Sequence, residues 1–181
     1  FDGSNPSSPT KNPARKCGIF TYYLFTFLAR FLNEYFSCAD KEAAMHDLNR
    51  FISAQERSYD AALREIKAGH KRTHWMWYIF PQIAGLGFSP TAQFYAINSM
   101  QEAKDYYAHP ALGKRLVEIS EALLALDTSD AGAVMGYPDD LKLRSSMTLF
   151  LAASGDAVFQ KVLDKFYSGK PDSKTLSILG L

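Results

Sequence analysis

One aromatic stretch, from His74 to Gln82, combines residues that could do chemistry with large apolar neighbours, and it holds both tryptophans of the chain, Trp75 and Trp77. A histidine titrates near neutral pH and can act as a general acid or base. Indole rings can stack on a flat ligand such as a nucleobase. Aromatic side chains also bury large areas in ordinary cores. The stretch therefore predicts a ligand site, the centre of the core, or both.

A second polar set occurs later in the chain: Asp139, Asp140, Lys142, Ser145 and Ser146. On a helix, Lys142 lies about one turn from both serines. Lys142 and a serine could act as base and nucleophile, although no third orienting group is visible. Alternatively, the lysine and hydroxyls bind an anionic or polar ligand, or they serve the helix itself through capping and backbone hydrogen bonds. We expect at least one of the two aspartates to cap the helix.

Our preferred hypothesis joins the two sets in one small-molecule site, binding or catalytic, between the aromatic stretch and a helix over residues 140–148. The candidate ligand-binding residues are His74, Trp75, Trp77, Gln82, Asp140, Lys142, Ser145 and Ser146. Polar groups set among apolar neighbours favour this hypothesis, because burying them costs free energy unless they are paired or used. The alternative is a non-enzymatic interaction or regulatory module, for which we would expect a large exposed apolar patch.

Composition and motif content narrow the function classes. The chain has 20 lysines and arginines against 19 aspartates and glutamates, a net charge of +1. Nucleic-acid binders usually carry a clustered basic excess, so we expect no nucleic-acid partner. The sequence contains no HExxH, P-loop, GxGxxG or nucleophile-elbow motif and no cysteine and histidine spacing typical of a metal site. We therefore expect neither a cofactor nor a bound metal, whereas a small anionic ligand remains compatible.

Helical periodicity dominates the chain after residue 46. Apolar residues follow an i, i+3, i+4 stripe over residues 47–67. Gln55 lies on the inward face, where we favour a hydrogen-bonded core or boundary residue over a site role. Further helices are expected over residues 90–97, 100–107, 110–126, 141–153, 157–167 and 172–179. Ser89 and Ser99 are predicted N-caps. Because no partner strand is evident, we also prefer a helix for residues 75–80. The pattern predicts an all-α fold, a compact multihelical single domain with short helices.

Residues 1–44 differ in composition from the rest, so we predict an N-terminal extension before a helical domain over residues 45–181. Residues 1–16 are rich in Ser, Pro, Asn and Lys and are predicted to be disordered. The apolar run that follows is shorter than the about 20 residues of a membrane span. A packing or surface helix is favoured over a targeting segment or membrane contact through residues 18–32. For Cys17 and Cys38 we favour free thiols in a reducing compartment over a disulfide between them, and we expect a cytoplasmic location.

Several longer motifs carry a family resemblance. They are Asp47-Leu48-x-Arg50-Phe51, His74-Trp75-Met76-Trp77, Phe80-Pro81-Gln82, His109-Pro110-x-Leu112-Gly113 and Asp140-x-Lys142-Leu143-x-Ser145-Ser146-Met147. Because of these motifs, the chain over residues 47–179 resembles a bacterial family of domains of unknown function, family 1810. Members of this family are sometimes labelled calpastatin-like. The resemblance implies a compact multihelical fold and no established activity. The sequence does not support the calpastatin label, because a folded helical domain lacks the disordered, repeated character of such an inhibitor.

Overall fold

The computed structural model describes residues 48–181, and these residues form a helical fold. An isolated bridge between Ile83 and Ile97 is the β pairing found among them. The all-α prediction is therefore confirmed for this part of the chain. The predicted extension over residues 1–44, the apolar run within it, the membrane contact through residues 18–32 and the two cysteines lie outside the described residues.

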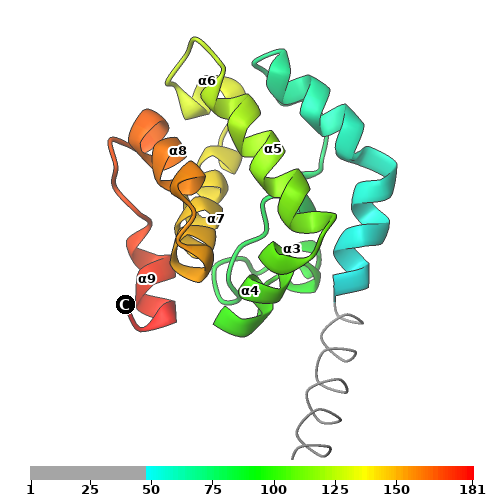
Figure 1. The fold of residues 1–181 in the computed structure, drawn as a ribbon, viewed down its shortest axis with the longest axis vertical. Helices are drawn as coiled ribbons and strands as arrows, with labels where there is room; N and C mark the ends of the chain where they lie inside the picture. The colour runs from blue at the N-terminus through cyan, green and yellow to red at the C-terminus, as the bar shows by residue number, and fades with distance from the viewer. Residues whose placement is uncertain (1–47) are drawn as a thin grey trace, which may run out of the picture. The chain divides into compact units, whose positions relative to one another are not determined.

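The helices are mostly short, as predicted, and Figure 1 shows their arrangement. The first described helix runs over residues 48–67. It is followed by α2 (Met76–Ile79), α3 (Pro90–Phe94), α4 (Met100–Ala108), α5 (Leu112–Leu124), α6 (Ala131–Met135), α7 (Asp139–Ser154), α8 (Ala157–Tyr167) and α9 (Ser173–Leu179).

Local capping signals fix where several helices begin. The hydroxyls of Ser89 and Ser99 each accept a hydrogen bond from the backbone N–H three residues on, at the starts of α3 and α4. Both predicted caps are confirmed. In a capping box the Glu102 side chain would accept from the backbone N–H of Ser99. Here it accepts from the backbone N–H of Asn98 instead and forms an ion pair with Arg50. That ion pair joins the helix over residues 48–67 to α4.

Several helices are shorter than the periodicity predicts; the one expected over residues 110–126, for example, is α5 (Leu112–Leu124). The helix expected over residues 90–97 ends at Phe94, because the next backbone groups pair elsewhere. The N–H of Ile97 donates to the carbonyl of Gln82, and the carbonyl of Ile97 accepts from Ala84. The aromatic stretch is helical for a single turn, in α2. Tertiary pairing thus takes the place of the helical hydrogen bonds that the pattern favours.

Helix α7 lies in the middle of the fold, in contact with α4, α6, α8 and α9 (Figure 1). Residues 145–150 are buried without interruption, and a helix that is covered on all sides has this pattern. Gln55, on the first described helix, is also buried, and it donates to Tyr106 and to the carbonyl of Tyr78. The prediction of a hydrogen-bonded core glutamine is confirmed. The exposed residue of α7, Leu141, lies in its first turn, so the N-terminal end of the helix reaches the surface.

Close packing of α5 on the end of α4 requires a glycine at position 113. A Cβ atom there would lie 1.8 Å from the carbonyl oxygen of Tyr107, a backbone atom that cannot move without displacing the helix. Gly132, in α6, is a useful comparison, because its Cβ would lie 3.2 Å from a side-chain atom, a carboxylate oxygen of Asp130.

We predict that Gly113→Ala lowers the free energy of unfolding by about 3 kcal/mol or more, because the backbones of α4 and α5 must separate. Chemical denaturation followed by circular dichroism measures the change. The control Gly132→Ala should change stability by no more than about 1 kcal/mol. Equal stability of the two variants would show that the contact between α4 and α5 is not tight.

Candidate functional site

The loop over residues 70–75 is anchored by one carboxylate, that of Glu65 near the end of the first described helix. Its oxygens accept hydrogen bonds from the backbone N–H groups of Arg72 at 2.8 Å and Thr73 at 3.1 Å. They also accept from the Thr73 hydroxyl at 2.7 Å and from the indole N–H of Trp75 at 2.8 Å. Partial burial alone would raise the pKa of Glu65, but these bonds outweigh it and lower the pKa to about 2. The carboxylate is therefore charged at neutral pH and holds Trp75 in place.

The same loop is fixed to α6 on its other side. The backbone N–H of Lys71 donates to the carbonyl of Val134 at 2.7 Å. The ring nitrogen Nδ1 of His70 lies 3.2 Å from the carbonyl oxygen of Ala133. Because α7 begins shortly after α6, these contacts bring the Lys71 side chain to the start of α7.

Two lysines converge there on one aspartate. The Asp139 carboxylate forms ion pairs with Lys71 at 2.6 Å and with Lys142 at 2.8 Å. Each ammonium also lies over an indole ring, Lys71 at 5.1 Å from the centre of Trp75 and Lys142 at 4.9 Å from that of Trp77. We call these five residues the Asp139 cluster. The aromatic stretch and the start of α7 are thus in direct contact, as the sequence predicts.

The charged groups of this cluster are partly buried, so solvent screens the interactions between them only weakly. The side chains of Lys71, Asp139 and Lys142 are 7%, 17% and 23% exposed. Burial alone would raise the pKa of Asp139, but hydrogen bonds and charge from the two ammonium groups lower it below its usual range. Two cations and one anion therefore share a partly desolvated space with a net charge of +1. The positive end of the α7 dipole adds to this field.

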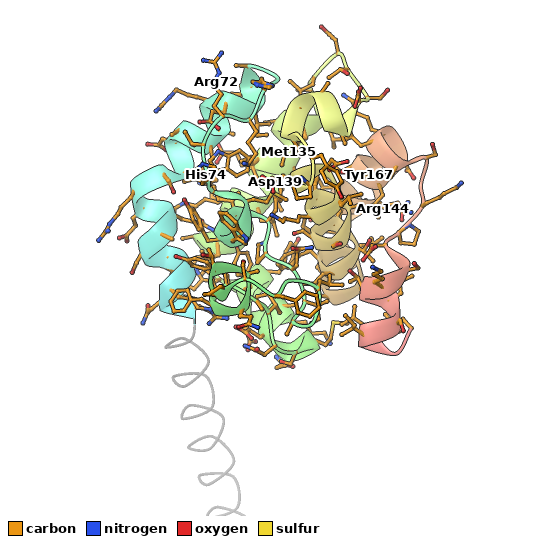
Figure 2. All side chains as sticks on the ribbon, turned by 180° about the vertical axis from the view of Figure 1, so that it is seen from behind. Arg72, His74, Met135, Asp139, Arg144 and Tyr167 are labelled. Atoms are coloured by element: carbon orange, nitrogen blue, oxygen red, sulfur yellow. The ribbon has the colours of Figure 1, made fainter. Side chains whose placement is uncertain are left out.

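Further charged and aromatic residues flank the cluster. In Figure 2 the labelled side chains of Arg72, His74, Asp139, Tyr167 and Arg144 lie in a band from the loop after the first helix to α7 and the end of α8. Arg144 lies over the Tyr167 ring at 5.9 Å and donates to two backbone carbonyls in the segment after α8. His74 is exposed at the other end of the band.

Asp140 has one carboxylate oxygen that is buried and has no hydrogen-bond partner among the described residues. The neighbouring hydroxyl of Tyr167 donates to the backbone carbonyl of Asp140 at 2.6 Å and not to its side chain. Burial, and then the charge of Asp140, raise the pKa of Tyr167. The expectation that an aspartate caps α7 is wrong, because Pro138 occupies the cap position and no side chain bonds the free N–H groups. Asp139 is instead bound by the two lysines.

The two predicted serines do not join the Asp139 cluster. Ser145 donates to the carbonyl of Leu141 at 3.2 Å and to Asp172, at the start of α9, at 3.1 Å. Ser146 is fully buried, and its hydroxyl has no hydrogen-bond partner within the described part of the chain. The lysine and serine pair considered for nucleophilic catalysis is not formed, since Lys142 bonds Asp139 and Ser145 bonds Asp172.

Of the remaining predicted residues, Gln82 is half-buried and its carbonyl accepts from Ile97, whereas Trp75 and Trp77 both belong to the cluster. Sequence reasoning missed Lys71 and Glu65. Lys71 lies in a basic loop directly before the aromatic stretch. This position in the sequence is the feature that could have identified Lys71 as a site residue. Nothing in the helical pattern distinguishes Glu65 from its solvated neighbours.

A separate groove of about 560 Å³ lies between α4, α5 and α8. Its lining residues are Tyr107, Gly113, Lys114, Val117, Glu118, Glu121 and Asp156, none of which belongs to the Asp139 cluster. Within residues 48–181, no three histidine, cysteine, aspartate or glutamate side chains are grouped as metal ligands. No helix in the same range is long and apolar enough to cross a membrane.

Comparison with known proteins confirms the family resemblance. A family model described as a protein of unknown function (DUF1810) matches residues 45–179. A similar solved structure is the conserved hypothetical protein Rv1873 from Mycobacterium tuberculosis, with 43% sequence identity and a TM-score of 0.73. The similarity covers 75% of this chain and 97% of that one. No curated protein matches the chain.

We predict that Glu65→Gln destabilises the domain by about 2 kcal/mol at neutral pH, because an amide cannot accept all four hydrogen bonds. The folded pKa lies below the usual 4.5, so the contribution is fully present above pH 4.5 and is lost as the pH falls toward about 2. Denaturant titrations across this range measure it. Glu56→Gln, at an exposed position of the same helix, should change stability by less than about 0.5 kcal/mol at neutral pH. A constant difference between wild type and Glu65→Gln at all pH values would contradict the assignment.

The two serines of α7 should respond in opposite directions to alanine. Ser146→Ala removes a buried hydroxyl without a partner and should stabilise the domain by about 1 kcal/mol. Ser145→Ala removes two hydrogen bonds and leaves Asp172 with one donor fewer, so we expect a loss of about 1–2 kcal/mol. Thermal and chemical unfolding of both variants provide the comparison. Destabilisation by Ser146→Ala would mean that its hydroxyl has a partner after all.

Proposed function

This chain belongs to the DUF1810 family of proteins of unknown function, and we propose that it binds a small anionic ligand at the Asp139 cluster. The observation that carries the proposal is the sharing of one carboxylate by two ammonium groups, those of Lys71 and Lys142, in a partly buried site. A structural ion pair needs one cation for each anion. The second lysine leaves a positive charge without a matching negative one inside the cluster.

The donors of the cluster suit an anion with two or more oxygens. Each ammonium group carries three N–H donors. The Asp139 carboxylate contacts each of the two ammonium groups through one of its oxygens. Both ammonium groups bond the same carboxylate, so they lie close enough together for a phosphate or carboxylate to bridge them. Charge-assisted hydrogen bonds of this kind are stronger than neutral ones. Lys142 is the more exposed of the two and gives access from solvent.

The surrounding field favours the same sign of ligand. Within the Asp139 cluster, Lys71 and Lys142 provide two positive charges against the one negative charge of Asp139, which leaves an excess of one. A local excess of this kind raises the concentration of anions near the site. The indole rings under the two ammonium groups hold them in place by cation–π attraction without neutralising them.

The arrangement favours binding over a particular reaction. Asp139 is ionised, and both of its oxygens are occupied by ammonium groups, so it is poorly placed to accept a proton from a substrate. Lys142 bonds Asp139, and the Ser145 hydroxyl bonds Leu141 and Asp172 and not the lysine. We therefore infer a ligand site and assign no bond-making step to it.

We predict that inorganic phosphate, at constant ionic strength, raises the unfolding temperature of the wild type, and that Lys142→Met weakens phosphate binding by at least about tenfold. Methionine keeps most of the stem that covers Trp77 and removes the charge. Thermal shift and isothermal titration calorimetry measure the two effects. Lys104→Met, at an exposed position of α4, is the matched control and should bind phosphate like the wild type.

Equal binding by wild type and Lys142→Met, or no binding by either, would overturn the proposal. The Asp139 cluster would then serve as a link between the loop over residues 70–75 and α7. An interaction or regulatory module without a small-molecule site would be the function to pursue.

A further inference from the structure

We propose that Asp139 occupies the place of the ligand's anionic group, so that an anion binds at the cluster by displacing the Asp139 carboxylate. This inference rests on the proposed anion site and concerns how that site is regulated. It makes Asp139 an internal competitor, which holds the two lysines together until a ligand replaces it. Three features support it: the way the carboxylate bridges the lysines, the burial of Lys71, and the position of Asp139 on α7.

The Asp139 carboxylate bridges the two ammonium groups as a bound anion would. Its oxygen Oδ2 lies 2.6 Å from Nζ of Lys71, and its oxygen Oδ1 lies 2.8 Å from Nζ of Lys142. These distances are those of charge-assisted hydrogen bonds. One lysine comes from the loop after the first described helix and the other from α7. A free carboxylate or phosphate would bridge them in the same way, with one oxygen on each nitrogen.

A second anion cannot share these lysines with Asp139 without strong repulsion. An oxygen that bonds Nζ of Lys142 lies within about 6 Å of the Asp139 oxygen on the same nitrogen, because both bonds are short. Like charges this close repel strongly where solvent screening is weak, and the Asp139 side chain is only 17% exposed. The carboxylate therefore leaves the lysines when the ligand binds.

The burial of Lys71 explains why the protein without a ligand needs an anion of its own. The Lys71 side chain is 7% exposed, whereas that of Lys142 is 23% exposed. The backbone N–H of Lys71 is bonded to the carbonyl of Val134, and its ammonium group lies over the Trp75 ring. A buried ammonium group without a counterion strongly destabilises a fold. Asp139 supplies the counterion until a ligand takes over this role.

The position of Asp139 on α7 lowers the free-energy cost of its displacement. Helix α7 begins at Asp139, and Pro138 at the cap position forms no side-chain cap. The positive end of the helix dipole stabilises a carboxylate in the first turn whether or not that carboxylate contacts a cation. The displaced side chain thus keeps a favourable place, and the ligand replaces the two ion pairs that are lost.

A competitor of this kind weakens the binding of every anion that uses the two lysines. The apparent affinity falls with the fraction of molecules in which the lysines are free of Asp139. Because the competing carboxylate belongs to the same chain, it acts at an effective concentration on the order of millimolar or higher. Removing its charge should therefore tighten anion binding. If Asp139 only positioned the lysines for a ligand, the same change would weaken binding.

Asp139→Asn tests the competition, because the amide keeps the shape of the side chain and removes its charge. We expect inorganic phosphate, at constant ionic strength, to bind this variant at least about tenfold more tightly than the wild type. Isothermal titration calorimetry measures both affinities. Asp140→Asn is the matched control, because it removes the same charge from the next residue, while the ion pairs of both lysines are with Asp139. It should tighten phosphate binding by less than about threefold.

The wild type provides a readout that does not depend on the folding of a variant. Carbon-13 NMR follows the side-chain carboxylate of Asp139 while phosphate is added. We expect its signal to move toward the chemical shift of a solvent-exposed aspartate as phosphate replaces it on the lysines. The carboxylate of Asp127, at an exposed position after α5, is the internal control and should not respond.

Asp139→Ala removes the carboxylate and opens its place to a small anion. We expect acetate to raise the unfolding temperature of this variant by at least about 2 °C, because a free carboxylate then serves as the counterion of Lys71. The wild type should not respond at the same concentration and ionic strength. Acetamide, which has a similar shape and no charge, is the control compound. A variant that acetate does not stabilise would show that the lysines hold no free anion in this place, against the inference.

The outcomes separate this inference from the function on which it rests. If phosphate binds the wild type through Lys142 but binds Asp139→Asn equally or more weakly, the competition is overturned and the anion site stands. The same conclusion follows if Asp140→Asn tightens binding as much as Asp139→Asn, or if the Asp139 signal of the wild type stays in place while phosphate binds. If neither the wild type nor Asp139→Asn binds phosphate, both proposals are overturned.

Discussion

Four hydrogen bonds to the Glu65 carboxylate are the constraint on which the candidate site depends. They satisfy the backbone N–H groups of Arg72 and Thr73, the Thr73 hydroxyl and the indole N–H of Trp75. Trp75 is buried, so its indole donor would otherwise cost free energy. With the loop held in this way, Trp75 fills the core and the Lys71 side chain lies against Asp139. A residue near the end of one helix thereby determines which cation meets the start of another.

Helix α7 divides its polar residues between structure and surface. The Ser145 hydroxyl donates to the Asp172 carboxylate, and the Thr148 hydroxyl accepts from the Asp172 backbone N–H. Both bonds hold the start of α9 against α7. Asp139 and Lys142, in the first turns, face the aromatic stretch. The division follows from the position of α7, because its middle is surrounded by other helices and its N-terminal end reaches solvent. The hydroxyls of Ser145 and Thr148, which the sequence places close to the candidate site, therefore hold α9 against α7.

A chain with a net charge of +1 can still present a positive site, because charges act locally. The excess of one positive charge in the Asp139 cluster is offset by acidic residues elsewhere, such as Glu118, Glu121 and Asp156 along the groove between α4, α5 and α8. Exposed charges further apart than about 8 Å are largely screened at physiological salt. Overall composition therefore says little about a site in which the charges are also partly buried.

The sequence alone determined the helical fold class and most helix starts, because periodicity and N-caps act within a few residues. The hydroxyl of Ser99, for example, bonds a backbone group three positions away. It also indicated that the tryptophans and Lys142 meet. Only the tertiary structure decided that Asp139 binds two lysines and caps nothing, and that Ser145 faces α9. These contacts join residues from separate helices, and helix packing, which a local pattern does not encode, sets the distances between them.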